Sequence, residues 1–231
     1  RAAVLRHLPY LVLTASLGVS LFNTLIYYAG RTTTALNLSL ISLVFPIFVL
    51  VLSRIFLGER LPPRRMAGIL IVLAGVVVLV TRGRPADILT LEPAAGDLLM
   101  LIAALVFSVY TLLLRRKPEG LGLATVQFST FALGTLILAP FFILERAGLP
   151  PLAWDAATVG AVLYIGIFAS MTAFMAWNKA IERIGTSSAG LVYYTLPIWS
   201  GLVAWIFLGE APGPAQGAAV ALIVGGIALA R

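Results

Sequence analysis

Cysteine is absent from the 231-residue sequence, and histidine occurs once, as His7. A chain without cysteine can form neither a disulfide framework nor a thiolate nucleophile. Charged residues are also scarce, at 11% of the chain, whereas hydrophobic residues reach 61% and the mean hydropathy is +1.04. Soluble domains carry about a quarter charged residues. These values exclude a soluble globular domain, a disulfide-rich scaffold and a disordered chain.

The few charged residues divide the sequence into eight uncharged, mostly apolar stretches of 16 to 26 residues. A bilayer core of about 30 Å is crossed by about 20 helical residues, so each stretch predicts one membrane-spanning helix. The run 69–80 is apolar without alternation, which argues against the strands of a membrane barrel. The stretches are 8–30, 32–53, 66–81, 98–114, 120–144, 156–178, 184–209 and 211–230.

Lysine and arginine are divided unequally between the two ends of these helices. The end that holds the N-terminus carries 12 of them and the opposite end carries 4. Basic residues are retained on the cytoplasmic side, so we expect both termini to be cytoplasmic. The net charge of +7 is then an orientation signal and a lipid contact, and not a nucleic-acid site. We expect an integral protein of a bacterial inner (cytoplasmic) membrane.

An internal repeat is visible at an offset of 151 residues. Residues 29–59 align with 180–210 without a gap, and nine of 31 positions are identical. The identities include Pro46 with Pro197 and the pentapeptide Ile-Phe-Leu-Gly-Glu that begins at Ile55 and again at Ile206. The offset is five helices, an odd number, so the two copies cross the membrane in opposite directions. Such an inverted-topology repeat is typical of secondary transporters.

The repeat also predicts the domain organisation. We expect a first repeat at residues 1–94 and a second, with five helices, at 95–231. The first repeat holds only three of the predicted helices. We therefore expect ten helices in the complete protein, of which this sequence contains eight and lacks the first two.

The motif Pro-x11-Gly-Glu, followed by a short loop and a glycine-containing apolar helix, occurs in both copies. The copies are Pro46…Gly58-Glu59…Gly68…Gly75 and Pro197…Gly209-Glu210…Gly217…Gly225. Together with residues 173–197, this pattern resembles the EamA family of the drug/metabolite transporter superfamily. The resemblance implies an all-α membrane protein with two inverted five-helix halves around a central cavity that opens alternately to each side. Members similar to the aromatic amino-acid exporter carry amino acids and related metabolites outward.

No constellation of catalytic residues is present in the sequence. Every Asp and Glu lies in a loop or at a helix end, and no spacing fits a metal site or an acid pair. The run 185–190 (GTSSAG) has no partner base and is interpreted as the start of a helix. We therefore expect no catalytic residue, no metal, no cofactor and no enzymatic activity. Because the apolar stretches contain no acidic residue or histidine, we expect transport without ion coupling.

The two aligned prolines are candidate hinges. Pro46 and Pro197 lie near the middle of their helices, where each removes a backbone donor. The carbonyl groups left free belong to Ser42 and Tyr193. Freed backbone groups in a membrane face protein or a water-filled cavity, so two interpretations stay open: a simple kink or a place on the cavity wall.

Polar and small residues that share helix faces are candidates for the substrate site. Asn23 and Tyr27 extend a stripe with Ser16 and Ser20, which either lines the path or bonds another helix. Trp177 is either a cavity residue or an anchor at the membrane interface. Asn37, Tyr110 and Gln127 are isolated and have weak claims. The predicted substrate-binding residues are Asn23, Tyr27, Ser39, Ser42, Trp177, Gly190 and Tyr193.

Glycine placement gives two structural expectations. Gly58 and Gly209 should end their helices, and we expect Glu59 to pair with Arg60 or Arg64 in a structural role. The stripe of Gly217, Ala221 and Gly225 predicts close packing of the last helix inside the monomer, with a dimer interface as the alternative.

The functional prediction is a membrane transporter that exports small metabolites, most simply amino acids, by alternating access through a central cavity. The alternatives are a carrier of another metabolite or a drug, and an intramembrane enzyme. The expected partners are a small-molecule substrate and the lipid bilayer, without nucleic acid, and the expected assembly is a monomer.

Overall fold

Helices are the only regular elements in the part of the chain that the computed structural model describes. That part is the whole chain except residues 1, 34, 61, 82, 85, 87, 88, 90–93, 148–153, 210–212 and 231. The predicted all-α membrane fold is confirmed. Among the described residues, four helical segments are long and apolar enough to cross a bilayer: Leu8–Thr32, Ala95–Arg115, Leu123–Arg146 and Ala156–Ile184.

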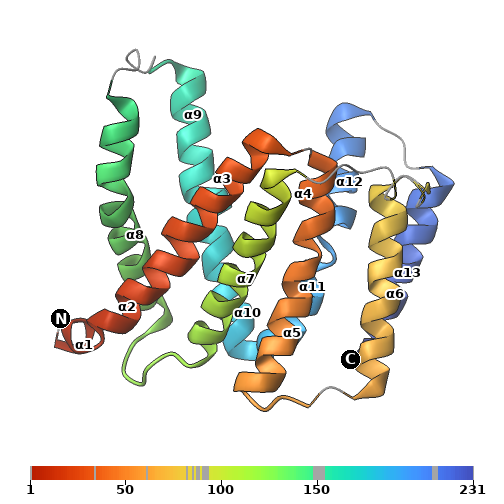
Figure 1. Ribbon diagram of the computed structural model, residues 1–231, viewed down its shortest axis with the longest axis horizontal. Helices are drawn as coiled ribbons and strands as arrows, with labels where there is room; N and C mark the ends of the chain where they lie inside the picture. Colours follow the sequence, from red (N-terminus) through yellow and green to blue (C-terminus); the bar gives the residue numbers. More distant parts are fainter. Residues whose placement is uncertain are drawn as a thin grey trace.

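The helices before residue 94 make three passes along the molecule (Figure 1). The first pass consists of α1 (Ala2–Arg6), α2 (Leu8–Ala15), the π-helix η1 (Ser16–Leu21) and α3 (Phe22–Thr32). The second consists of α4 (Ala35–Ser42) and α5 (Val44–Phe56), and the third of α6 (Pro63–Val80).

Five further passes follow. Two are single helices, α7 (Ala95–Arg115) and α8 (Leu123–Arg146). The next is built from α9 (Ala156–Tyr164), the π-helix η3 (Ile165–Thr172) and α10 (Ala173–Ile184). The last two are α11 (Thr186–Tyr193) with α12 (Leu196–Leu208), and α13 (Pro214–Ala230).

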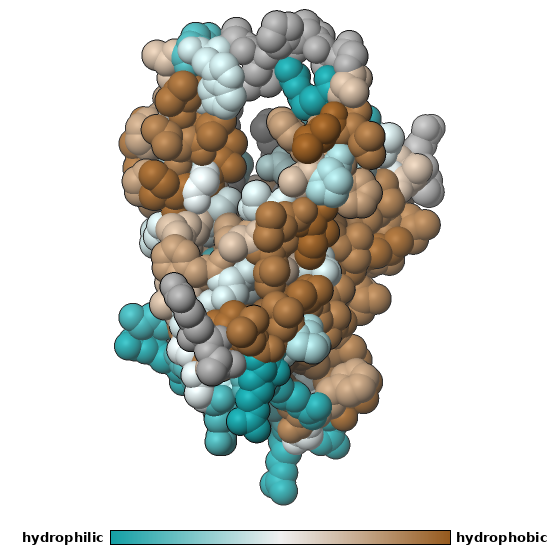
Figure 2. Space-filling view, turned by 90° about the vertical axis from the view of Figure 1, so that its left-hand side faces the viewer, coloured by the Kyte–Doolittle hydropathy of each residue, from teal (hydrophilic) through white to brown (hydrophobic). Residues whose placement is uncertain are grey.

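Both chain termini lie at the same end of the helical bundle, as an even number of passes requires (Figure 1). The α5–α6 and α7–α8 connections lie at that end too, and α5 and α7 each carry an arginine, Arg54 and Arg115, in their last turn. Figure 2 shows hydrophilic side chains gathered at this end and apolar side chains over most of the remaining face. We call it the basic end.

The inverted repeat is visible in the helix boundaries. At the offset of 151, the bounds of α4 coincide with those of α11, and the bounds of α5 differ from those of α12 by one residue. The π-helices η1 and η3 also occupy equivalent places. Helix α6 runs away from the basic end whereas α13 runs toward it (Figure 1). Equivalent helices therefore run in opposite directions.

Each predicted hinge helix is divided into two. Helix α4 ends at Ser42 and α5 begins at Val44, so Pro46 lies in the first turn of a new helix and not in the middle of a continuous one. In the second copy α12 begins at Leu196, and Pro197 is its second residue. A helix tolerates proline there because the first-turn amides have no intrahelical acceptor.

Helices α6 and α13 pack against each other through glycine. A Cβ on Gly68 would lie 2.5 Å from the Gly226 carbonyl oxygen, and one on Gly75 would lie 3.0 Å from the Ala219 carbonyl oxygen. The predicted stripe of Gly217, Ala221 and Gly225 is wrong in its register, because nothing lies within 4 Å of a Cβ on Gly217 or Gly225. The buried stripe of α13 is Ala219, Ile223, Gly226 and Ala230.

Helix ends follow local chemistry. Gly58 and Gly209 occupy equivalent positions after α5 and α12, and both have a positive φ, +68° and +70°. Glycine adopts this conformation without a Cβ clash, as predicted for a helix terminator.

At the start of α9, the Asp155 carboxylate accepts a hydrogen bond from the Thr158 backbone N–H at 2.7 Å. This hydrogen bond stabilises the charged form and lowers the pKa of Asp155.

Candidate functional site

Aromatic rings from helices of both copies meet where α4–α5 and α11–α12 are interrupted. Phe45, in the first turn of α5, is central: its ring centroid lies 4.9 Å from Tyr193, 5.2 Å from Phe107 and 5.6 Å from Trp177. Phe174 joins the group 5.9 Å from Phe107. We call Phe45, Phe107, Phe174, Trp177 and Tyr193 the aromatic cluster.

Three of the predicted site residues lie together at this cluster. Tyr193 is hydrogen-bonded to the Ser42 side chain, and its ring lies edge-on to Trp177 at 6.3 Å. Trp177 donates its indole Nε1–H to Thr111 Oγ1 at 3.4 Å, so its polar atom has a protein partner. Trp177 thus packs against the buried core around Phe45, which argues against the interfacial anchor. The cluster thus offers apolar ring faces with a hydroxyl edge.

A fourth predicted residue, Gly190, supports the cluster from behind. Its nearest neighbours are Pro46 and Val49, and a Cβ at Gly190 would lie 3.6 Å from Pro46 Cβ. The proline of one copy therefore packs on the small residue of the other. The Pro197 side chain lies outside the described residues.

The remaining predicted site residues are not brought to the cluster. Asn23, in the first turn of α3, donates to the carbonyl oxygen of Val19 in the preceding π-helix η1 at 2.8 Å, so its side chain satisfies a local backbone group. Tyr27 exposes 66% of its surface. The Ser39 side chain lies outside the described residues. A parallel contact occurs in η3, where Thr172 donates to the Ile167 carbonyl oxygen at 2.8 Å. The polar side chain of Asn23 is thus explained by its hydrogen bond to a carbonyl oxygen of the π-helix, and not by a contact with the aromatic cluster.

A buried polar triad joins α7, α8 and α10, and two of its members, Tyr110 and Gln127, were expected from the sequence to be isolated. The Tyr110 hydroxyl donates to Asn178 Oδ1 at 3.2 Å, and Asn178 Nδ2 donates to Gln127 Oε1 at 2.6 Å. Each of the three is 1% exposed. Among the described atoms, Gln127 Nε2 has no hydrogen-bond partner. The prediction that Tyr110 and Gln127 are isolated is wrong, because these partners lie far apart in the sequence and meet only in the folded chain.

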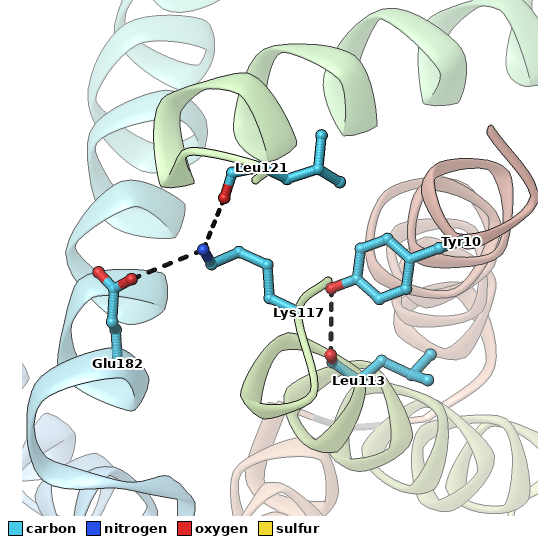
Figure 3. Close-up of polar contacts among 5 residues, drawn as sticks. All are labelled: Tyr10, Leu113, Lys117, Leu121 and Glu182. Atoms are coloured by element: carbon cyan, nitrogen blue, oxygen red, sulfur yellow. Dashed lines mark hydrogen bonds and ion pairs between the residues drawn. The ribbon is translucent and has the colours of Figure 1, made fainter. Parts of the chain in front are cut away.

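Lys117, in the connection between α7 and α8, joins two segments at the basic end (Figure 3). Its ammonium group donates to the Leu121 carbonyl oxygen at 2.6 Å and lies 3.8 Å from Glu182 Oε1. Tyr10 donates to the Leu113 carbonyl oxygen at 3.1 Å. Lys117 therefore ties the α7–α8 connection to α10, while Tyr10 ties α2 to α7.

Glu59 holds the start of α11 at the basic end. Its Oε1 accepts from Thr186 Oγ1 at 2.9 Å, its Oε2 accepts from Ser187 Oγ, and Thr186 Oγ1 lies 2.8 Å from Ser53 Oγ. The predicted pairing of Glu59 with Arg60 or Arg64 is not among the ion pairs of the described residues. Glu59 instead accepts hydrogen bonds from the hydroxyl groups at the start of α11. Its negative charge also interacts favourably with the positive end of the helix dipole.

Asp97 makes the corresponding arrangement at the opposite end. Its Oδ1 accepts from Thr33 Oγ1 at 2.5 Å and from Asn37 Nδ2 at 3.1 Å. Thr33 lies two residues before Ala35, the first residue of α4, and Asn37 lies in the first turn of α4. Since α4 and α11 are equivalent helices, one carboxylate holds the start of each, at opposite ends of the bundle. We call these contacts the Glu59 lock and the Asp97 lock.

The described side chains suit binding and movement better than covalent chemistry. No group of three or more His, Asp or Glu residues among them could hold a metal ion. Instead, side chains from both halves form the aromatic cluster at the two interrupted helices, and one carboxylate lock lies at each end of the bundle. Interrupted helices at a repeat interface are typical of secondary transporters.

The fold and this arrangement define a membrane transporter. The sequence matches the EamA-like transporter family over residues 2–81 and 94–231, and the chain belongs to this family. The family resemblance of the repeated Pro-x11-Gly-Glu motif is therefore confirmed, and the protein is a transporter and not an enzyme.

Individual relatives agree with this assignment. An "Uncharacterized transporter" of Archaeoglobus fulgidus is 31% identical and aligns with 89% of this chain and 69% of its own length. A "Probable terminal-alkyne amino-acid exporter" of Streptantibioticus cattleyicolor is 29% identical over 97% of this chain and 73% of its own. The "Aromatic amino acid exporter YddG" of Ancylobacter novellus is 31% identical, with 83% and 65% covered. A solved crystal structure with 26% identity covers all of this chain and 81% of its own, with a TM-score of 0.77.

Proposed function

We propose that the protein exports small metabolites with an apolar or aromatic side chain, amino acids among them, by alternating access. The observation that carries the proposal is the aromatic cluster, in which Phe45, Trp177 and Tyr193 face one another at the two helix interruptions. Ring faces bind apolar and aromatic groups, and the Ser42 and Tyr193 hydroxyls supply polar contacts. Two similar proteins are named as amino-acid exporters, which supports this substrate class.

The two carboxylate locks supply a gate at each end. Releasing the Glu59 lock frees α11 at the basic end, and releasing the Asp97 lock frees α4 at the other. Prolines at the starts of α5 and α12 leave those junctions without a full set of helical hydrogen bonds, so each half-helix can tilt there. In this scheme one lock opens while the other stays closed, and the aromatic cluster faces each side in turn.

The residues proposed to line the path are Ser42, Trp177, Gly190 and Tyr193, with Pro46 and Pro197 as hinges; Asn23, Tyr27 and Ser39 remain weaker candidates. The proposed domain division is 1–94 and 95–231. The proposed setting is a monomer in a bacterial inner membrane with the basic end cytoplasmic, because basic residues are retained on that side. Cysteines placed at Glu119 and Ala147 in this Cys-free chain test the orientation: a membrane-impermeant reagent added outside cells should label Ala147→Cys alone.

Transport of a substrate panel into proteoliposomes tests the function. Aromatic amino acids, aliphatic amino acids, nucleosides and sugars would be compared as labelled solutes. Uptake of amino acids, greatest for those with aromatic or large apolar side chains, is expected. Uptake confined to nucleosides or sugars would reject the proposed substrate class while leaving the transporter assignment in place.

A further inference from the structure

A cavity of about 210 Å³ lies between α5 and α7, apart from the aromatic cluster. Its walls are apolar, with Leu52, Phe56 and Leu57 on one side and Val109 and Leu112 on the other. Its single charged wall residue is Arg116. None of these side chains belongs to the aromatic cluster, so the cavity is a separate site.

The cavity opens on the outer surface close to the basic end. Phe56, in its wall, and the neighbouring Ile55 are 56% and 65% exposed. Arg116 follows the last residue of α7 and donates from Nη2 to the carbonyl oxygen of Phe56, the last residue of α5. The guanidinium group therefore sits where the apolar helices end, at the level at which lipid headgroups meet the protein.

This combination fits one ligand chemistry. An apolar cavity excludes the polar metabolites that a hydroxyl-edged site would bind, but it suits a hydrocarbon chain. One water molecule needs roughly 10–15 Å³ of cavity volume, so the cavity has room for several methylene-sized groups. The guanidinium is positioned for a phosphate, which it binds with two parallel hydrogen bonds. Basic pockets between membrane helices at the cytoplasmic side bind anionic headgroups.

We propose that the α5–α7 cavity binds an anionic phospholipid of the leaflet at the basic end, with an acyl chain along Leu52 and Leu112 and the phosphate on Arg116. Charge complementarity favours this occupant over a zwitterionic lipid, because Arg54 and Arg115 lie in the last turns of the same two helices. The bound lipid bridges α5, which carries Pro46, and α7, which carries Asp97. It would therefore couple membrane composition to the packing beside the hinge.

Lipid retention by the purified protein tests the site. Native mass spectrometry would compare phosphatidylglycerol with phosphatidylcholine, and melting temperatures would be measured in mixed micelles of each lipid. The expected preference for phosphatidylglycerol is about five-fold, the effect of one basic residue at an anionic surface. Arg116→Gln should remove most of the preference, Arg116→Lys should keep most of it, and Leu52→Trp should fill the cavity and remove lipid of either kind.

Arg183→Gln is the matched control, since Arg183 is an exposed cation in the last turn of α10, away from the cavity. It should retain the wild-type preference and the stabilisation by phosphatidylglycerol. Equal retention of the two lipids by the wild type would overturn the proposal, as would an equal loss in Arg183→Gln. A dimer that Leu52→Trp dissociates would assign the cavity to a second copy and equally reject the lipid.

Discussion

The Tyr194 hydroxyl donates a hydrogen bond to the Leu43 carbonyl oxygen at 3.1 Å, across a separation of 151 residues. That separation is the offset of the internal repeat, so the two partners are equivalent residues of the two copies. Equivalent residues touch each other only where the pseudo-symmetry axis passes between them. Val72 and Ile223, another equivalent pair, are both fully buried in the same core. The axis therefore runs beside both helix interruptions.

Replacing Tyr194 by phenylalanine removes this bond without changing the ring. Tyr194 is fully buried, and the Leu43 carbonyl lies where α4 gives way to α5. The expected loss is about 1–3 kcal/mol of stability, because a buried acceptor loses its donor. Melting in detergent should show a clear decrease for Tyr194→Phe and no change for Tyr28→Phe, whose side chain is 48% exposed. Equal melting temperatures for both variants would show that the bond contributes nothing.

The α6–α13 contact predicts opposite outcomes for adjacent glycines. A Cβ at Gly226 would lie 2.7 Å from the Gly68 carbonyl oxygen and 2.8 Å from the Val72 amide nitrogen, so Gly226→Ala forces the helices apart. We expect a cost of about 1–3 kcal/mol. Gly225→Ala meets nothing within 4 Å and should be neutral or slightly stabilising through helix propensity. Thermal unfolding of both variants checks the register; similar melting temperatures would contradict it.

The Glu59 lock should control access from the basic end. Glu59→Gln weakens two charge-assisted hydrogen bonds to Thr186 and Ser187, so α11 should separate from α5 more often. A cysteine at Ser42 should then react several-fold faster with a reagent added at that end. Glu119→Gln, which changes an exposed carboxylate, is the control and should leave the rate unchanged. An unchanged rate in Glu59→Gln would mean that these contacts do not gate the path.

Substitutions in the buried triad should cost more stability at its centre, Asn178, than at its edge, Gln127. Asn178→Leu leaves both the Tyr110 hydroxyl and Gln127 Oε1 without a partner, whereas Gln127→Leu also removes the unpartnered Nε2. Each buried group left without a partner costs about 1–3 kcal/mol, so the change at Asn178 should be the more destabilising. Comparing melting temperatures of the two variants is sufficient. A larger loss in Gln127→Leu would imply that Nε2 has a bound partner, such as water.

Hydropathy and the repeat predicted the passes and their inverted order because both signals are local in the sequence. The helix interruptions were harder to place. A proline in an apolar run predicts a disturbed helix, but whether it lies inside one helix or at the start of a second depends on the contacts around Ser42 and Leu43. The register of α13 was missed for a similar reason: Gly217, Gly225 and Gly226 are alike in sequence, and only the position of α6 decides which of them is buried.

The aromatic cluster could not be predicted from composition. Phe45, Phe107 and Phe174 are apolar residues in apolar helices, and nothing in the sequence distinguishes a ring that faces the interior from one that faces lipid. Tyr193 and Ser42 were identified because the repeat aligns them beside the prolines. Tyr27 was grouped with Asn23 by helical spacing alone, which does not say which side of a helix its neighbours cover.

Transport by Tyr193 variants tests the central claim, that substrate passes the aromatic cluster, most directly. Tyr193→Ala removes a ring that packs beside Phe45 and Trp177 and, in this account, contacts the substrate. One aromatic contact is worth about 0.5–1.5 kcal/mol, so the uptake of an aromatic amino acid by proteoliposomes should fall by up to about ten-fold. Tyr193→Phe should keep most of the activity, and Val192→Ala, which alters an exposed neighbour, should keep all of it. Melting temperatures would be measured alongside to identify unfolded variants. Wild-type uptake by a folded Tyr193→Ala protein would contradict the claim.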